Sequence, residues 1–461
     1  MKDVLELTAD YAAQFLTSLD DRPVGARASF GELVDALGGP LPREGTDDEQ
    51  VVAELVAAAE PGLIGSQTGR YFGFVFGSAL PAAVAADWLS TAWDQNAFSV
   101  VTSPAGAAAE EVAGSWIAEL LGLPESVSCG FVTGAQGANT TALAAARGHV
   151  LRATGWDVAR EGLSGAPPIR VFAGEERHVT IDRSLRLLGL GTAALELVPA
   201  DGQGRMRADA LADALGSADG PAIVCAQAGN VNTGASDPLP EIAAAAASAD
   251  AWLHVDGAFG LWAAASPRFR HLVRGAERAD SWATDAHKWL NVPYDCGLVF
   301  TRHPQAHGDA MAVAASYLQR SDGRSPSDWV LESSRRARGF AVWAALRSLG
   351  RSGVEELVER CCDHARTFAE ILDADGDVEI LNEVVLNQVL VRFRDDDETT
   401  REVVRRVQED GTCWLGGTVW QGKAAMRISV SSFRTTQEDV ERSAGAILAA
   451  ATAVSGPLRT S

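Results

Sequence analysis

The sequence predicts an α/β fold: a mostly parallel central sheet in a large domain, a small C-terminal α+β domain and an N-terminal helical arm. Two observations predict it. Short apolar runs alternate with helix-length segments through the middle of the chain, and a long helical pattern near the end is followed by two more strand-like runs. We expect the arm at residues 1–87, the large domain at 88–345 and the small domain at 346–461.

The arm is predicted from apolar residues at helical spacing. They are Val4, Leu5, Leu7, Tyr11, Phe15 and Leu16, and the turn-rich sequence DDRPVGAR follows them. Residues 87–122 then predict two helical patches interrupted by Ser103 and Pro104, where the proline suits the first turn of the second helix.

Strands are predicted wherever short apolar runs end in small or polar residues. In the large domain these runs are 129–132, 169–174, 221–229, 251–257, 280–284 and 296–302, and in the small domain they are 386–393 and 425–432. Helix-length segments such as 240–252 and 335–372 lie between them. A parallel sheet of this kind binds ligands at the carboxyl ends of its strands, so the informative residues are expected there.

Composition limits the partners. The chain has 461 residues, 47% of them hydrophobic, and a formal net charge of -22. That charge would repel nucleic acid and anionic membrane surfaces, and no run reaches the roughly 20 apolar residues of a membrane helix. The first residues are acidic and amphipathic, unlike a signal peptide. We expect a cytoplasmic protein whose partner is a small molecule or another protein.

The six cysteines are scattered and lack CxxC spacing. They are Cys129, Cys225, Cys296, Cys361, Cys362 and Cys413, most of them in apolar runs. This pattern favours buried thiols over zinc ligands or disulfides.

Lys288 is one of only three lysines, with Lys2 and Lys423, among 39 lysines and arginines. A desolvated lysine can lose its proton and form a Schiff base, whereas arginine stays protonated. Lys288 is either retained for that chemistry or is a chance survivor in an arginine-rich sequence.

The stretch TGAQGAN, residues 133–139, lies where a strand is expected to turn into a helix. Its small residues would let backbone N–H groups approach a phosphate at the helix N-terminus, or would form only a tight connection. It is neither a GxGxxG fingerprint nor a Walker A loop, which argues against nicotinamide binding and nucleotide hydrolysis.

Asp256 ends an apolar strand in HVDGAFG, where an ionised carboxylate needs a cationic partner. A protonated pyridine nitrogen would be such a partner. Two alternatives remain open: a capping aspartate at a strand–helix turn, and a metal site of His254, Asp256 and His287, although the metal site leaves Lys288 unexplained.

Lys288 follows Asp256 by one further connection and strand, so both are expected at the same edge of the sheet. A phosphate-binding turn, a buried acid and a strand-end lysine together are what pyridoxal phosphate (PLP) requires.

The sequence resembles the group II PLP-dependent amino acid decarboxylases, relatives of aromatic-L-amino-acid decarboxylase with the aspartate aminotransferase fold (fold type I). The likeness extends over nearly the whole chain. It is carried by LPAAVAADWL, TSPAGAAAEEVAGSWIAELLGLP, FVTGAQGAN, AGNVNTGASDPL, WLHVDGAFG, TDAHKWLNVPYDCG, ESSRRARGFAVWAAL and MRISVSS. The HVD and HKW stretches are the most specific of these.

The resemblance implies a role for each matching residue. Lys288 would bind the cofactor aldehyde, Asp256 would pair with the pyridinium nitrogen, and Ala258 would pack on one ring face. His178, which alone would be read as a surface histidine, would stack on the other face and contact the substrate. Further cofactor contacts are implied for Ala135, Gln136 and His287 at the phosphate and for Asn230 and Asn232 near the ring oxygen.

The sequence departs from the family in one loop. Aromatic-acid decarboxylases carry a tyrosine there that helps to protonate the substrate carbon, whereas LQRSDGRSPSDWVLESS, residues 318–334, has Trp329 but no tyrosine. Tyr317 stands at the beginning of the loop and not at the matching place. The proton could come from His178 or water, or the carbon could meet oxygen and give an aldehyde.

We therefore expect a homodimeric, PLP-dependent carboxy-lyase that converts an L-amino acid, aromatic or similar, to its amine and carbon dioxide. The alternatives are oxidative aldehyde formation, a carbon–carbon lyase or aldolase, and a non-catalytic PLP-binding protein. Phe72, Phe74, Phe76 and Phe98 could line a substrate pocket, although such residues are more often core.

Overall fold

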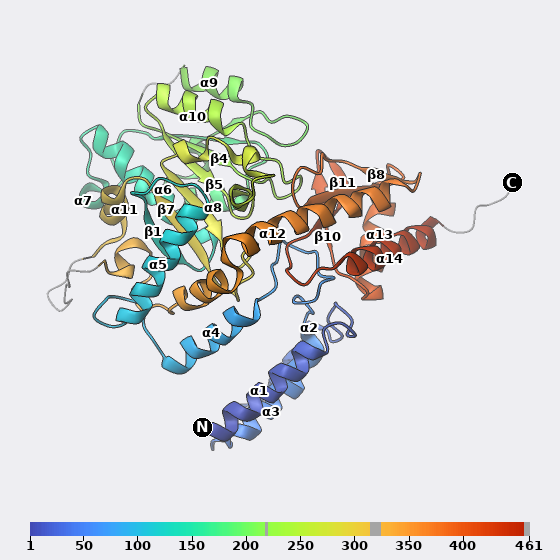
Figure 1. Ribbon diagram of the computed structural model, residues 1–461. Coiled ribbons are helices and arrows are strands. Elements are labelled where there is room, and N and C mark those ends of the chain that lie inside the picture. Colours follow the sequence, from blue (N-terminus) through green and yellow to red (C-terminus); the bar gives the residue numbers. More distant parts are fainter. Residues whose placement is uncertain (217–219, 314–323, 456–461) are drawn as a thin grey trace. The chain divides into compact units, whose positions relative to one another are not determined.

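The computed structural model describes residues 1–216, 220–313 and 324–455. The chain divides into two compact units. The larger contains Gly77–Arg366 and Asn382–Val389, and the smaller contains Met1–Phe76, Thr367–Leu381 and Leu390–Ser461. We describe each unit by itself (Figure 1).

The larger unit is built on a seven-stranded sheet in the order β1-β7-β6-β5-β4-β2-β3. Its strands are β1 (Ser128–Val132), β2 (Arg170–Gly174), β3 (Leu195–Val198), β4 (Ala222–Gln227), β5 (Trp252–Asp256), β6 (Ser281–Asp285) and β7 (Gly297–Thr301). The strands from β6 through β5, β4 and β2 to β3 are parallel, and β7 runs antiparallel to both of its neighbours. The predicted mostly parallel α/β fold is confirmed.

The antiparallel strand β7 places the ends of β1 and β6 side by side. Both strands run opposite to β7 and therefore in the same direction as each other. Val132 at the end of β1 and Asp285 at the end of β6 both pair with Gly297. The turn after β1 thus starts level with the end of β6, at the edge where the sequence predicts ligand binding.

The larger unit also contains helices. They are α4 (Pro81–Trp93), α5 (Pro104–Leu120), α6 (Ala135–Ala153), α7 (Val158–Glu161), α8 (Val179–Leu187), α9 (Ala208–Gly216), α10 (Leu239–Ser248) and α11 (Pro304–Met311). Of these, α5, α6 and α10 contact strands of this sheet. Short 3-10 turns are η2 (Thr192–Ala194), η3 (Gly260–Ala265), η4 (Arg270–Val273), η5 (Ala276–Arg278) and η6 (Pro326–Trp329). The long helix α12 (Gly339–Asp373) contains a break at Gly350, whose φ is +62°.

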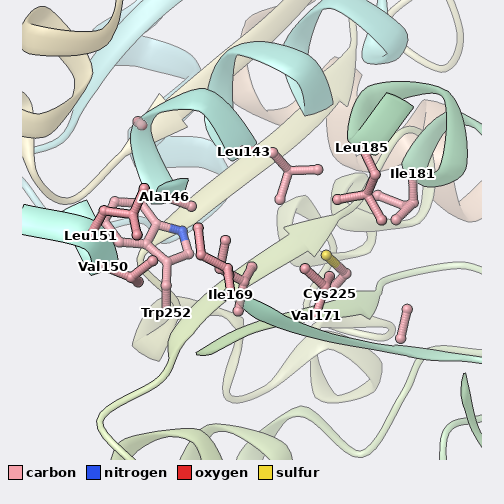
Figure 2. Packing of buried hydrophobic residues seen from close by; sticks show 13 residues of the cluster. Leu143, Ala146, Val150, Leu151, Ile169, Val171, Ile181, Leu185, Cys225 and Trp252 are labelled. Atoms are coloured by element: carbon pink, nitrogen blue, oxygen red, sulfur yellow. The ribbon is translucent and has the colours of Figure 1, made fainter. Parts of the chain in front are cut away.

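Helix α6 covers β2, β4 and β5 through an apolar core. Figure 2 shows Leu143, Val150 and Leu151 of α6 beside strand residues such as Cys225 and Trp252, all buried. Small alanines on α6 let the helix backbone lie close to the sheet, so the polar residues on its first turns also reach the strands.

The smaller unit has helices at both ends of its sequence and a four-stranded sheet. Its elements are α1 (Lys2–Thr17), α2 (Phe30–Leu37), α3 (Asp48–Ala59), η1 (Glu60–Gly62), β8 (Val378–Ile380), β9 (Gln388–Phe393), α13 (Asp397–Asp410), β10 (Gly416–Trp420), β11 (Lys423–Ser429) and α14 (Gln437–Ser455). The sheet order is β10-β11-β9-β8. The predicted N-terminal helix and both predicted strands are present, whereas β8 and β10 were not predicted.

Two further expectations concern the cysteines and membrane-spanning helices. All six cysteines are buried, as their apolar surroundings predicted. Within the described parts of the chain, no helix combines the length and apolar character needed to cross a membrane.

Candidate active site

The loop that carries Lys288 is fixed by close packing. The N–H of Asn291 donates to the carbonyl of Lys288 at 3.2 Å, and the Asn291 side-chain oxygen accepts the N–H of Ser78 at 2.9 Å. A Cβ at Gly77 would lie 1.9 Å from the carbonyl oxygen of Lys288. Only glycine therefore permits this approach, and the backbone that presents the lysine is held on both sides.

The amine of Lys288 lies beside the start of α6. Its Nζ is 3.2 Å from Oδ2 of Asp285, whose Oδ1 accepts the N–H of Ala135 at 2.6 Å. Ala135 is the first residue of α6, so this N–H is one of the donors that a helix leaves unpaired at its N-terminus. Asp285 is only 2% exposed. Lysine, carboxylate and helix start meet in one place.

Gly297 on β7 makes this meeting possible. A Cβ there would lie 2.6 Å from the Cα of Gly134 and 2.8 Å from Oδ1 of Asp285. Any larger residue would push the turn before α6 away from the end of β6. The glycine thus lets the start of α6 lie beside the Asp285 carboxylate.

His287 presents a donor to the same region. Its Nδ1 accepts the N–H of Cys296 at 3.0 Å, so the neutral ring carries its proton on Nε2. That atom is 3.6 Å from Oδ1 of Asp285. Burial lowers the pKa of His287, Asp285 raises it and Lys288 lowers it, which leaves a neutral ring with Nε2–H as a donor.

Asp256 is a buried carboxylate, 5% exposed, that accepts hydrogen bonds from neutral groups. Oδ2 accepts from Asn139 Nδ2 at 2.9 Å and from the Thr180 hydroxyl at 3.4 Å, and Oδ1 accepts the N–H of Ala258 at 3.2 Å. Among the ion pairs of the described residues, none involves Asp256. A buried anion in this position calls for a cation from a ligand.

His178 stands at the N-cap of α8 and is linked to Asp256 through Thr180. Its Nδ1 accepts the N–H of Thr180 at 3.3 Å and lies 2.9 Å from the Thr180 hydroxyl oxygen. Because Nδ1 is an acceptor, the proton of neutral His178 is on Nε2. His178 can therefore act as a proton donor from Nε2.

The remaining predicted residues lie in the surrounding loops. Gln136 Nε2 donates to Ser184 Oγ at 3.0 Å and so joins α6 to α8. Asn230 Nδ2 donates to the carbonyl of Glu176 at 3.0 Å, and its Oδ1 accepts the N–H of Asn232 at 2.8 Å. These two asparagines shape the loop after β4; their contact with a cofactor stays a prediction.

The structure also disfavours the metal alternative. His254 Nε2 lies 2.9 Å from Asn139 Oδ1 and its Nδ1 lies 3.0 Å from Ser281 Oγ, so both ring nitrogens have other partners. Among the described residues, no group of three or more histidine, cysteine or acidic side chains could hold a metal ion.

Three residues of the site were not singled out from the sequence: Asp285, Asn139 and Thr180. Each had a signal, because Asp285 ends a strand three residues before Lys288, Asn139 lies in TGAQGAN and Thr180 follows His178. The packing of α6 and α8 on the sheet was needed to connect them.

The loop at residues 318–334 lies only partly in the described structure. Tyr317 and residues 318–323 are outside the described residues. The described part begins at Arg324, whose guanidinium is 4.8 Å from the Trp329 ring, and His307 Nε2 donates to the Trp329 carbonyl at 2.8 Å. Trp329 is thus packed against α11 and is not a substitute for a tyrosine at the reacting carbon.

The residues present fit PLP. Asp256 offers an anion without a cation among the described protein residues, Lys288 offers an amine at the same edge, and the start of α6 at Ala135 lies beside the Nε2–H of His287, where helix N–H groups suit a phosphate. Fold and site together define a PLP-dependent enzyme of fold type I.

A protein-family model described as the pyridoxal-dependent decarboxylase conserved domain matches residues 37–394. The chain belongs to this family, and it is a PLP-dependent carboxy-lyase of amino acids.

Individual relatives agree. Tryptophan decarboxylase 1 of Oryza sativa subsp. japonica is 28% identical over 94% of this chain and 90% of its own. 4-Hydroxyphenylacetaldehyde synthase of Rhodiola rosea is 27% identical over 95% of this chain and 92% of its own. The crystal structure of Oryza sativa TDC with PLP and tryptamine has a TM-score of 0.92 and 25% identity, covering 98% of this chain and 97% of that one.

Asp285 leads to a prediction about cofactor affinity. Its charge lies at the helix start that suits the phosphate, and asparagine would keep an oxygen for the Ala135 N–H while removing that charge. We expect Asp285→Asn to bind PLP about tenfold more tightly, a fraction of the Coulomb energy between two close charges. Fluorescence titration measures this. Asp250→Asn, the same change at an exposed position before β5, is the control, and weaker binding by Asp285→Asn would contradict the prediction.

Proposed function

We propose that this protein removes carbon dioxide from an aromatic L-amino acid and releases the amine. The observation that carries the proposal is the buried Asp256 carboxylate, which has only neutral donors around it and lies at the sheet edge that also carries Lys288. The names of the relatives, tryptophan decarboxylase among them, support an aromatic substrate.

PLP, when bound, supplies an electron sink for the bond electrons that the departing carbon dioxide leaves behind. In this proposal Lys288 holds the cofactor covalently through its aldehyde, Asp256 holds the proton on the ring nitrogen, and Ala258 packs against one ring face. The helix start at Ala135, together with Gln136 and His287, binds the phosphate, and Asn230 and Asn232 shape the loop near the ring oxygen.

His178 has the proton-donor role in this proposal. The N–H of Thr180 donates to Nδ1, which fixes the ring and leaves the proton on Nε2. A donor that is fixed by its other nitrogen can return a proton to the substrate carbon at a defined angle.

The function is tested by offering the purified holoenzyme tryptophan, tyrosine, phenylalanine and hydroxylated analogues, with glutamate and histidine as non-aromatic comparisons. Carbon dioxide and the amine should form in equal amounts from at least one aromatic substrate. A preference for a non-aromatic amino acid would refute the substrate class, and no carbon dioxide from any amino acid would refute the activity.

A second candidate function is oxidative formation of the aldehyde. Residues 324–334, which lead into the buried Arg335, contain no tyrosine, and one relative is named an aldehyde synthase. That reaction consumes oxygen and water and releases carbon dioxide, ammonia and hydrogen peroxide with the aldehyde. Peroxide and ammonia in place of amine would identify it.

His178→Asn distinguishes the two outcomes through the product ratio. Asparagine can still cap α8, but it lacks the imidazole Nε2–H. We expect a larger share of aldehyde and peroxide under air, because slower protonation of the substrate carbon leaves more time for its reaction with oxygen. Amine and aldehyde are measured together by chromatography. A slower reaction with an unchanged product ratio would mean that His178 is not the proton donor.

We also propose a homodimer. Helices α1 to α3 expose large apolar side chains, including Leu5, Phe30, Val34, Leu37, Val51 and Leu55. Apolar exposure of this extent is typical of a surface that another chain covers. The net charge argues against nucleic acid, and the family supports a second copy of this chain as the partner.

Light scattering at assay concentration tests the dimer. Phe30, which is 83% exposed, is replaced by aspartate, and Val419→Asp on β10 is the control at another exposed apolar residue. We expect the wild type and Val419→Asp to be dimers and Phe30→Asp to dissociate more readily. A fully active wild-type monomer would contradict the proposal.

We also propose a cytoplasmic location, which the buried cysteines support. All six are buried, and burial raises the pKa of Cys129 and Cys225 to about 12. Thiols of this kind suit a reducing compartment.

A further inference from the structure

A row of buried polar side chains runs behind Asp256 along β5. Trp252, His254 and Asp256 alternate along the strand, so their side chains lie on the same face. Asn139 of α6 and Ser281 of β6 complete the row; Ser281 pairs directly with His254 across the sheet. Four of the five side chains are at most 2% exposed and Asp256 is 5% exposed.

The hydrogen bonds of this row have a single direction. Trp252 Nε1 can only donate, and it donates to Ser281 Oγ at 2.9 Å. The Ser281 hydroxyl then has its own proton to give, and its neighbour is His254 Nδ1 at 3.0 Å. A neutral His254 that accepts at Nδ1 carries its proton on Nε2.

His254 in turn decides the orientation of Asn139. Its Nε2–H donates to Asn139 Oδ1 at 2.9 Å, so the amide nitrogen must face the other way. There Nδ2 donates to Asp256 Oδ2 at 2.9 Å and to Thr180 Oγ1 at 3.0 Å. If Asn139 were turned over, its oxygen would face the carboxylate and two acceptors would oppose each other.

The row stays neutral apart from its last member. Burial lowers the pKa of His254 to about 4, although the Asp256 charge raises it. At neutral pH every donor from Trp252 to Asn139 is therefore uncharged and points towards one carboxylate. Hydrogen bonds in such a series polarise one another and favour the negative charge at its end.

We propose that Asn139, His254 and Ser281 are positioning residues that hold the Asp256 carboxylate in one orientation. The inference rests on the proposed function, in which Asp256 faces the ring nitrogen of PLP. Asn139, the last donor of the row, binds Oδ2, and the Ala258 N–H binds Oδ1. These two hydrogen bonds oppose rotation of the carboxylate when a cation approaches.

The tautomer of His254 is the first test, and it does not depend on catalysis. Nitrogen NMR of protein labelled in histidine is recorded between pH 6 and 8, and His254→Phe assigns the signal. We expect a neutral ring with its proton on Nε2 and no titration in this range. A proton on Nδ1, or titration near the usual histidine pKa, would overturn the proposal.

The second test compares two buried hydroxyls. Ser281 belongs to the row, whereas Thr141 of α6 is also fully buried and its hydroxyl oxygen has no hydrogen-bond partner among the described residues. We expect Ser281→Ala to lower kcat about tenfold, with KM for the amino acid within about twofold, and Ser281→Thr to restore it. Thr141→Val should change neither. Equal losses in both variants would mean that Ser281 matters only for packing.

The third test measures coupling through PLP affinity. Asn139→Ala should weaken PLP binding about tenfold in the wild-type background and have little effect in the Asp256→Ala background, since the donor then has no carboxylate to hold. Equal effects in both backgrounds would overturn the proposal.

Circular dichroism shows which variants fold, and His254→Asn replaces His254→Phe if the latter does not. A wild-type protein that binds PLP and has the expected tautomer but releases no carbon dioxide would refute the function and leave the positioning role intact. A protein that releases carbon dioxide but carries the His254 proton on Nδ1 would refute only the positioning role.

Discussion

Lys288→Ala is expected to lower turnover about 10³-fold or more and to abolish covalent attachment of PLP after borohydride reduction. The wild-type adduct should map to the peptide that contains Lys288. The other lysines, Lys2 and Lys423, are 84% and 51% exposed in their side chains, so the assignment has few competitors. Mass spectrometry of the reduced, denatured and digested protein measures it.

Two control variants distinguish the need for the Lys288 amine from the need for its positive charge. Lys288→Arg keeps a cation beside Asp285 but cannot bind the aldehyde, so it should fold well, bind PLP reversibly and remain inactive. Lys423→Arg should retain full activity and the adduct. Covalent PLP that survives denaturation in Lys288→Ala would refute the role of Lys288.

The sequence predicted the parts of this site that depend on strand ends. Asp256 and Lys288 follow apolar runs, and such runs form strands whose carboxyl ends meet at one edge of a parallel sheet. The strands β5 and β6 were found for this reason. Strand β3 was missed because its four residues, LELV, are half-exposed and resemble the end of a loop.

The hydrogen-bond partners could not be predicted in the same way. Asn139 lies in a run of small residues that is typical of any buried helix turn. Its contact with both Asp256 and His254 depends on how α6 crosses β5, which is set by the sheet order and by glycines such as Gly297. Such contacts join residues more than a hundred positions apart, and local pattern contains no information on them.

Asp256→Asn is expected to weaken PLP binding by about 10- to 100-fold and to lower turnover further. Asparagine has the size of aspartate and can accept from Asn139 or from the Ala258 N–H but not from both, so the loss reports the charge and one hydrogen bond rather than the packing. A hydrogen bond to a charged group contributes about 1.5–3 kcal/mol, which accounts for the affinity, and the ring nitrogen without its anion is a poorer electron acceptor. Fluorescence titration and amine formation measure the two effects separately.

Asp237 provides the matched control for this prediction. It is also a buried aspartate, and it accepts the N–H groups of Met206 and Gln227, both at 2.7 Å. Burial raises its pKa to about 6, and it lies in the loop between β4 and α10. Asp237→Asn should therefore lower the denaturant midpoint while PLP affinity and turnover per folded molecule stay near wild type. If Asp256→Asn behaved in the same way as Asp237→Asn, with stability reduced but PLP affinity and turnover kept, Asp256 would be a turn residue and the ring nitrogen would need another partner.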